Sequence, residues 1–250
     1  MNIPLSFEDL AAAEVCFAVA SRLLYDEPCA TEVAAQVVDR QFSDAPFAGD
    51  NEFERRGLAL LDGWCVAVGG CADAPSATVE ALIADSSFND GVDELRREWL
   101  RLFVGLGAPE ASCLESFYVE PNSHMFGKNT LAVRQAYRRH GLQVEKLHSE
   151  PDDHLGLMLG FLAYLMRAEG EAVAAADEAA ADALADEQEQ FLVDHVLPWL
   201  AAWRYAVGRH ARTDYFRGVG DFVFGLVAHY AERFGIRFDE GAQAFKRAAR

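Results

Sequence analysis

Residues 149–165 read SEPDDHLGLMLGFLAYL, and this stretch decides the fold. After an acidic start, the stretch is so rich in apolar residues that, with about 3.6 residues per helical turn, they would cover every side of a helix. A helix without a polar face lies at the centre of a domain, so other helices must surround it. Proline is favoured at the first helical position, and Asp152 and Asp153 in a first turn interact favourably with the helix dipole. We therefore expect a central helix from Pro151 to about Glu169.

Helical periodicity continues on both sides of the central stretch. Apolar residues at spacings of three and four predict further helices over residues 7–25, 30–40, 52–68, 77–85, 92–104, 128–140, 171–196 and 214–234, with Pro198 ending or kinking the helix before it. We find no run of alternating apolar and polar residues that predicts a strand. The sequence thus predicts an all-α protein, with a single globular domain of about ten helices over residues 1–250. Its N- and C-terminal halves are expected to join at a hinge near residues 142–151.

The composition is that of an ordinary globular protein, with 51% apolar and 25% charged residues in a chain of 250. Forty acidic residues against 22 basic ones give a net charge of −18. Such a charge repels nucleic-acid phosphates and anionic lipids and attracts cationic partners. It serves equally well to keep a protein soluble, so the charge alone does not identify a partner.

The lack of targeting signals and the pattern of cysteines indicate the cellular compartment of the protein. No stretch reaches the roughly 18 to 20 apolar residues that span a bilayer, and no basic region followed by an unbroken apolar run marks a secretion signal. We therefore expect a cytoplasmic protein without stable membrane insertion. The five cysteines are scattered and lack C-x-x-C spacing, which favours free buried thiols in a reducing compartment.

A long irregular segment, residues 105–127, interrupts the helices with glycine, proline, serine and asparagine. Segments of this length inside a compact domain are usually functional. Apolar and aromatic side chains flank it: Trp99, Leu102, Phe103, Phe117 and Tyr118. They either pack in the core or line an apolar groove bordered by acids such as Glu98, Glu115 and Glu120. Such a groove would suit a peptide with a basic start and an apolar continuation.

Signals for catalysis are weak throughout. His148 and the acidic run Glu150–His154 provide metal-binding residue types, but not at the spacing of three or four that converges on one helix face. A structural role at a helix start, a ligand or peptide site, and a metal-dependent hydrolase using Asp152, Asp153, His154 and His148 therefore remain as alternatives, in that order. Ser116 and Cys113 lie outside any nucleophile motif, and Gly105–Gly107 is not a phosphate loop. We expect neither enzymatic activity nor a bound cofactor or metal.

Three segments resemble the TorD/DmsD/NarJ family of redox-enzyme maturation chaperones, nearest to its TorD and DmsD branch. REWLRLFVGLGAPEASCLESFYV at 97–119 resembles the family's aromatic helix, Gly/Pro loop and Ser-x-aromatic element. SEPDDHLGLMLGFLAYL matches its E-P-x-D-H signature, and FLVDHVLPWLAAW at 191–203 matches its H-x-x-P-W element. The likeness extends from about residue 12 to residue 234. The three motifs in the correct order make the resemblance specific.

This resemblance implies an all-α TorD-like fold and a cytoplasmic chaperone, not an enzyme. The family binds the twin-arginine leader and apo catalytic subunit of a molybdenum-cofactor-containing oxidoreductase, assists folding and cofactor insertion, and proofreads export. It also implies a monomer or a domain-swapped homodimer. The family's leader-binding positions correspond to Trp99, Leu102, Phe103, Ser116, Tyr118, Asp153 and His154, and Glu150, Pro151 and Asp152 complete the signature. The remaining alternative within the family is a NarJ-like assembly factor that grips the mature subunit.

The chemistry of a twin-arginine leader is compatible with these residues. Arginine forms bidentate hydrogen bonds with carboxylates, so Asp153 or an acid near it is the expected partner of one leader arginine. Leader side chains buried against Trp99 and Phe103 would add roughly 1.5 to 3 kcal/mol each. His154 is expected to serve as a neutral hydrogen-bonding group that orients Asp153. After association costs, we expect an affinity in about the micromolar range.

Overall fold

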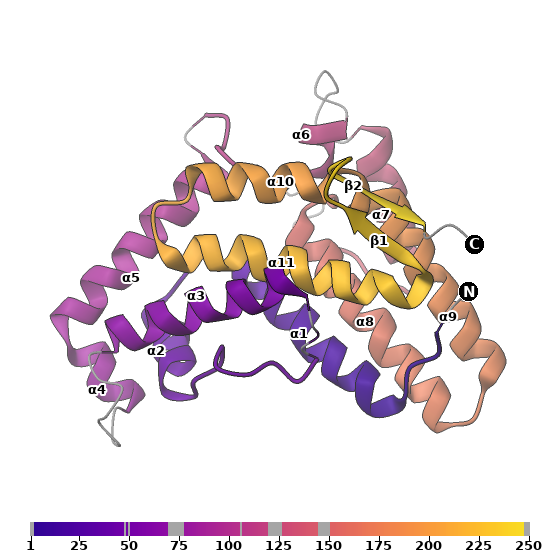
Figure 1. The fold of residues 1–250 in the computed structure, drawn as a ribbon, viewed down its shortest axis with the longest axis horizontal. Helices are drawn as coiled ribbons and strands as arrows, with labels where there is room; N and C mark the ends of the chain where they lie inside the picture. The colour runs from indigo at the N-terminus through magenta and orange to yellow at the C-terminus, as the bar shows by residue number, and fades with distance from the viewer. Residues whose placement is uncertain are drawn as a thin grey trace. The chain divides into compact units, whose positions relative to one another are not determined.

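A computed structural model describes residues 3–47, 49, 51–69, 78–105, 107–119, 127–144 and 151–247. Within these residues the chain forms eleven α-helices and one two-stranded sheet, which confirms the all-α prediction (Figure 1). Contacts divide the chain into two compact units. The first unit comprises residues 1–25, 113–203 and 226–250, and the second comprises residues 26–112 and 204–225.

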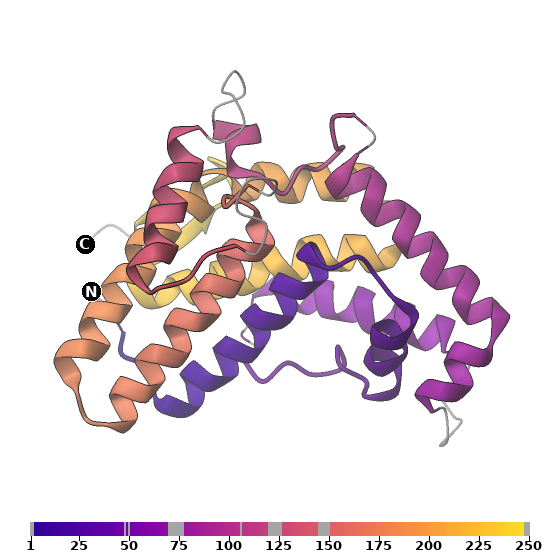
Figure 2. The same ribbon diagram turned by 180° about the vertical axis from the view of Figure 1, so that it is seen from behind.

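The first unit is built on α8 (Leu155–Ala174), which packs against α1 (Phe7–Tyr25) over most of its length and against α9 (Glu178–Phe191) (Figure 2). Eleven of the 20 residues of α8 are buried, as expected for a central helix. The helix α1 approaches closely because Gly156 has no side chain. A Cβ atom at Gly156 would lie 2.9 Å from the backbone oxygen of Ser21.

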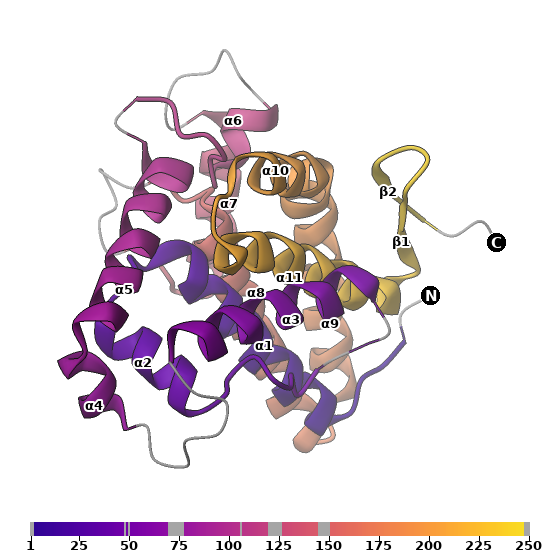
Figure 3. The ribbon, with the colours of Figure 1, turned by 60° about the vertical axis from the view of Figure 1, so that its left-hand side comes forward.

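Shorter elements complete the first unit. They are α6 (Glu115–Val119), α7 (Lys128–Arg139), a π-helix (Leu192–Val196), a 3₁₀ turn (Glu232–Phe234) and strands β1 (Ile236–Asp239) and β2 (Ala244–Arg247). The two strands form an antiparallel hairpin in which Ile236 pairs with Arg247 (Figure 3). The sequence did not predict this hairpin, because four residues per strand are too few for a clear alternating pattern.

The second unit contains α2 (Ala30–Val38), α3 (Glu52–Val68), α4 (Val79–Ala84), α5 (Ser86–Trp99) and a π-helix (Leu100–Val104). It also includes the end of α10 (Leu197–His210) and most of α11 (Asp214–Ala231). In this unit α3 lies close to α11, since a Cβ atom at Gly57 would lie 2.3 Å from the backbone nitrogen of Phe222.

The predicted helix boundaries agree best where caps are clear. The bounds of α1 and α3 are those predicted, and Asn51 caps α3 by accepting hydrogen bonds from two backbone N–H groups. The predicted start of the central helix at Pro151 is wrong, because α8 begins at Leu155. The predicted helix over 171–196 is also wrong, because α8 continues to Ala174 and α9 begins only at Glu178.

Three further expectations bear on the chain as a whole. No helix among the described residues is long and apolar enough to cross a membrane. Four cysteines within the described residues are free thiols, and three of them are buried: Cys16, Cys65 and Cys113. The single domain and the hinge near residues 142–151 stay predictions, and residues 145–150 lie outside the described part of the chain.

Candidate functional site

The signature residues fix the beginning of α6 to the beginning of α8. Residues 113–115 lie antiparallel to residues 153–155, with Leu114 opposite His154. The backbone N–H of Leu155 donates to the oxygen of Cys113 at 2.7 Å, and the N–H of Glu115 donates to the oxygen of Asp153 at 3.0 Å. The segment before α8 is therefore a short extended stretch that holds α6 in place.

Asp153 is fully buried and connects three helices. Its Oδ2 accepts the backbone N–H of Ser116 at 2.9 Å, near the start of α6. Its Oδ1 accepts the hydroxyl of Thr130 on α7 at 2.9 Å. The bond from Thr130 is buried and the bond from Ser116 is partly buried, so both satisfy a carboxyl group that has no contact with water. Asp153 therefore sets the position of α6 relative to α7 and α8.

Asp152 is also fully buried, and its carboxylate forms an ion pair with Arg134 on α7. The Nη2 and Nε atoms of Arg134 both donate to Oδ2, at 2.7 and 3.0 Å. The hydrogen bond with Asp152 raises the pKa of Arg134 above its usual value. The backbone oxygen of Asp152 accepts the Tyr137 hydroxyl at 3.0 Å. Burial, with a contribution from the nearby carboxylates, raises the pKa of Tyr137 well above 10.

His154 caps α8. Its Nδ1 accepts the backbone N–H of Gly156 at 3.1 Å, and its ring lies edge-on to Tyr25 with centroids 5.5 Å apart. A ring nitrogen that accepts a hydrogen bond carries no proton, so this geometry belongs to the neutral imidazole. Capping was the structural role expected for this segment, but the cap is His154 rather than the two aspartates.

The H-x-x-P-W element meets the signature at α6. His195 lies in the π-helix, and its Nδ1 is 3.1 Å from Oε2 of Glu115, which is 1% exposed. The indole nitrogen of Trp199 donates to the backbone oxygen of His195. The ring of Trp199 stacks on Tyr118, with centroids 5.1 Å apart and planes 19° apart. π-Helices are rare and often mark functional sites.

Three large apolar side chains on α6 and α7 are exposed. Phe117 is 45% exposed and Val119 is 44% exposed, while Leu131 on the neighbouring α7 is 45% exposed. The hydroxyl oxygen of Tyr118 is buried, and no described residue forms a hydrogen bond with it. Burial raises the pKa of this phenol. We refer to the three exposed residues Phe117, Val119 and Leu131 together as the α6 platform. They lie on two neighbouring helices that the buried carboxylate of Asp153 connects.

The three predicted residues that precede the irregular segment, Trp99, Leu102 and Phe103, belong to the second unit. Leu102 is fully buried, and Phe103 packs edge-on against Phe216 with centroids 5.6 Å apart. Both therefore take the core position that was one of the two sequence alternatives. Trp99 is half-buried, and Leu100 is 42% exposed.

Two of the three acids expected to border a groove, Glu98 and Glu115, are buried. Glu98 is 4% exposed and accepts the backbone N–H groups of Arg212 and Thr213, the latter at 3.0 Å. Glu115 is paired with His195. Glu120 and the signature residue Glu150 lie outside the described residues.

The structure thus brings five predicted residues together in the first unit: Ser116, Tyr118, Asp152, Asp153 and His154. Sequence reasoning missed their partners Thr130 and Arg134, which lie 23 and 18 residues away and carry no local signal. Among the described residues no group of three or more His, Cys, Asp or Glu is arranged to hold a metal ion. His148 lies outside them.

The arrangement suits binding more than covalent chemistry. The thiol of Cys113 is fully buried, and burial raises its pKa, which disfavours the reactive thiolate. Asp152 and Asp153 are both engaged by partners within the fold. Exposed apolar residues on a rigidly supported helix are a common form of contact surface for a protein or peptide.

Comparison with known proteins places these motifs in a family. The sequence pattern of the nitrate reductase delta subunit family matches residues 71–204. The chain is 30% identical over 138 residues to the Tat proofreading chaperone DmsD of Salmonella typhimurium, covering 55% of this chain and 61% of that protein. It is 30% identical over 125 residues to the chaperone protein TorD of Vibrio cholerae, covering 50% of this chain and 55% of TorD.

A third relative, the probable Tat proofreading chaperone DmsD of Haemophilus influenzae, is 32% identical over 71 residues, which are 28% of this chain and 35% of that protein. The chain therefore spans less than two thirds of the length of these relatives. The family pattern, in contrast, covers more than half of the chain and includes all three motifs. The chain belongs to the nitrate reductase delta subunit family, the TorD/DmsD/NarJ family of redox-enzyme maturation chaperones.

Proposed function

We propose that this protein is a cytoplasmic chaperone, not an enzyme, that binds the twin-arginine leader of a molybdenum-cofactor-containing oxidoreductase subunit. It holds that subunit during folding and cofactor insertion and so prevents premature export. The observation that carries the proposal is the meeting of three family motifs around α6, whose outer residues Phe117 and Val119 are exposed. Relatives named as Tat proofreading and TorD chaperones support it.

The α6 platform is the proposed contact for the apolar part of the leader. Phe117, Val119 and Leu131 are each close to half exposed, so a helical or extended leader can bury them without unfolding the chaperone. Asp153, in contrast, is fully buried and already accepts two hydrogen bonds. We propose that Asp153 acts mainly by positioning α6. A leader arginine would reach its carboxylate only by displacing Thr130 or Ser116.

The test of the proposed function is calorimetry of the purified chain with a synthetic twin-arginine leader. We expect saturable binding with Kd in about the micromolar range. Replacing both leader arginines by lysine should weaken binding about tenfold or more, because lysine lacks the planar bidentate fork. The absence of any binding, or equal binding of both peptides, would contradict the proposal.

The same peptides separate direct contact from positioning by Asp153. If Asp153 contacts a leader arginine, the Asp153→Asn variant should lose the preference for arginine over lysine. If Asp153 positions α6, the variant should bind both peptides more weakly and keep their ratio. A double-mutant cycle measures this coupling directly.

The second candidate is an assembly factor that binds the mature catalytic subunit, as in the NarJ-like alternative. The family description as a nitrate reductase delta subunit favours it. Binding of a subunit that lacks its leader with unchanged affinity, together with no binding of the isolated leader, would establish this candidate in place of the first.

A further inference from the structure

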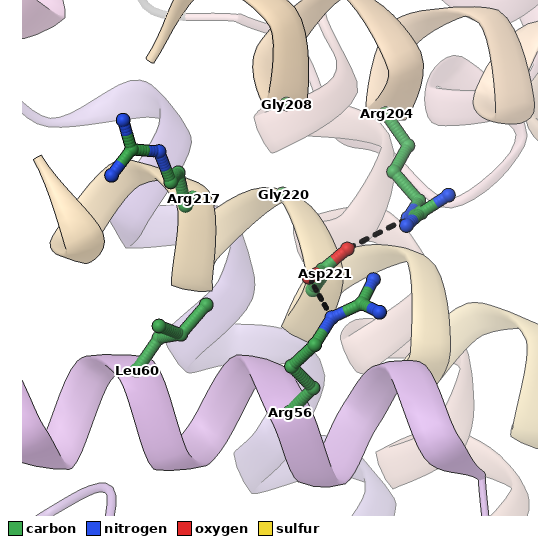
Figure 4. Close-up of a pocket in the computed structure, with 7 residues that line it drawn as sticks. All are labelled: Arg56, Leu60, Arg204, Gly208, Arg217, Gly220 and Asp221. Carbon is green, nitrogen blue, oxygen red and sulfur yellow. Dashed lines mark hydrogen bonds and ion pairs between the residues drawn. The ribbon is translucent and has the colours of Figure 1, made fainter. Parts of the chain in front are cut away.

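A cavity of about 250 Å³ lies within the second unit, between α3, α10 and α11 (Figure 4). Three arginines line it, Arg56 from α3, Arg204 from α10 and Arg217 from α11, together with Asp221. Three guanidinium groups lie against the carboxylate of Asp221 and that of Asp214, which pairs with Arg217 beside the pocket, so three positive and two negative groups leave a formal charge of +1. The whole chain carries −18, so this pocket is a local exception to its charge.

Asp221 fixes two of the arginines at one end of the pocket. Its two oxygens accept the Nε of Arg56 at 2.6 Å and the Nε of Arg204 at 2.7 Å. The guanidinium of Arg204 also lies 4.1 Å from the ring centroid of Phe53, which holds it further in place. Within the described residues, no acceptor takes a hydrogen bond from the Nη nitrogens of Arg56 or Arg204. These donors remain for a ligand.

In Figure 4 the guanidinium of Arg217 lies apart from Asp221 and from the two arginines paired with it. Its Nη1 forms an ion pair with Asp214 at 2.8 Å, and both side chains are about half exposed. An exposed pair of this kind is weak, so Arg217 can turn toward a ligand at little cost. The pocket thus offers guanidinium donors at two separated ends.

Gly208 lies on the α10 side of the pocket. It lines the pocket, it is exposed, and a Cβ atom added to it would meet no atom within 4 Å. A side chain at this position therefore starts in open space beside the pocket, so a large side chain here is a way to obstruct it.

We propose that this pocket binds a small anion that carries negatively charged oxygens at both ends, such as pyrophosphate or a short dicarboxylate. Arginine suits such a ligand because its planar fork matches phosphate and carboxylate oxygens. Asp221 is neutralised by its two partners and orients them, so it does not repel the ligand from the Nη edges. The site lies in a different unit from the α6 platform, and its ligand is independent of the proposed leader.

The experiment is calorimetric titration of the full chain with pyrophosphate, and separately with succinate and inorganic phosphate, at constant ionic strength. We expect saturable binding that Gly208→Phe and Arg217→Ala each weaken about tenfold. Tighter binding of pyrophosphate identifies a phosphoryl ligand, whereas tighter binding of succinate identifies an organic acid.

Matched controls lie on α3 of the same unit. Gly63 also has no atom within 4 Å of an added Cβ but does not line the pocket, so Gly63→Phe controls for the added ring. Arg55 is exposed outside the pocket, so Arg55→Ala controls for lost charge. Neither control should change the affinity more than about twofold. No saturable binding of any of the three anions, or equal losses in variants and controls, overturns the proposal.

Discussion

The two ends of α8 both contain buried carboxylates, but they are stabilised differently. At its C-terminal end Glu169 forms an ion pair with Arg233 at 2.7 Å, and both side chains are only 4% exposed. Gln188 and Tyr230 complete that network with further buried hydrogen bonds. Just before its N-terminal end, Asp153 is equally buried, but the two bonds described for it come from neutral donors.

The two buried carboxylates therefore have different roles: Glu169 stabilises the core, and Asp153 positions α6. The network of Glu169 lies among buried side chains, so its natural role is to hold the core together. The bonds of Asp153 lead to α6 and α7, whose outer residues Phe117 and Leu131 are exposed. Loss of the first network should therefore chiefly lower the free energy of unfolding, whereas loss of the second should chiefly displace α6.

The largest loss of stability is expected when Glu169 is replaced. The Glu169→Ala variant leaves Arg233 buried without its carboxylate partner, which should lower the free energy of unfolding by about 3 to 5 kcal/mol. Denaturant unfolding measures it. Asp93→Ala, which breaks the exposed pair with Arg96, is the control and should cost at most about 1 kcal/mol. If both variants lowered the free energy of unfolding by the same amount, the buried network of Glu169 would not be a main source of stability.

A smaller loss is expected for Asp153→Asn. The amide oxygen can still accept one of the two hydrogen bonds. The amide NH2 then faces the other donor, and the side chain carries no charge, so the free energy of unfolding should fall by about 2 to 3 kcal/mol. Thr130→Val removes a single bond and should cost about 1 to 2 kcal/mol. Asp186→Asn, at an exposed position, should stay within about 0.5 kcal/mol of the parent. A cost for Asp153→Asn as small as this control would remove it from the support of α6.

A buried tyrosine also lies near each end of α8, and the two differ in their hydrogen bonds. Tyr137 donates one hydrogen bond to the backbone of Asp152, whereas the Tyr230 hydroxyl bonds both Gln188 and Arg233. Tyr137→Phe should therefore cost about 1 kcal/mol, and Tyr230→Phe about twice that. The exposed Tyr205 provides the control substitution, which should be neutral.

Both tyrosines also predict a pH dependence. Burial raises the pKa of Tyr137 and of Tyr230 above 10. Above about pH 10 the unfolded chain loses these protons while the folded chain keeps them, so stability falls as pH rises. Each tyrosine should contribute a slope of about −1.4 kcal/mol per pH unit there, and each Phe variant should lack its share. Unchanged slopes in both variants would show that neither phenol is protected in the fold.

Much of the fold was predictable because its information is local. The apolar spacing of α1 and of α3 gave their bounds correctly. The start of α8 was predicted wrongly because proline followed by two aspartates is a frequent helix opening. Here those carboxylates bond to Arg134 and Thr130, and contacts across 18 or more residues leave no periodic trace.

The candidate site was predictable only in part for the same reason. The motif residues Ser116, Asp153 and His154 were identified by resemblance, and the structure places them around α6. Phe103 was expected either in the core or in a groove, and only its packing against Phe216 distinguishes the two. The arginine pocket was not expected at all, since Arg56 and Asp221 lie 165 residues apart.

The smallest effect on stability, and the most direct test of the central claim, concerns Phe117. Its side chain is 45% exposed, so Phe117→Ala should change the free energy of unfolding by no more than about 0.5 kcal/mol. If the α6 platform binds the twin-arginine leader, the same substitution should weaken leader binding about tenfold in calorimetry. Val15→Ala on α1, which is 52% exposed, should leave it unchanged. Wild-type leader affinity in Phe117→Ala would contradict the account.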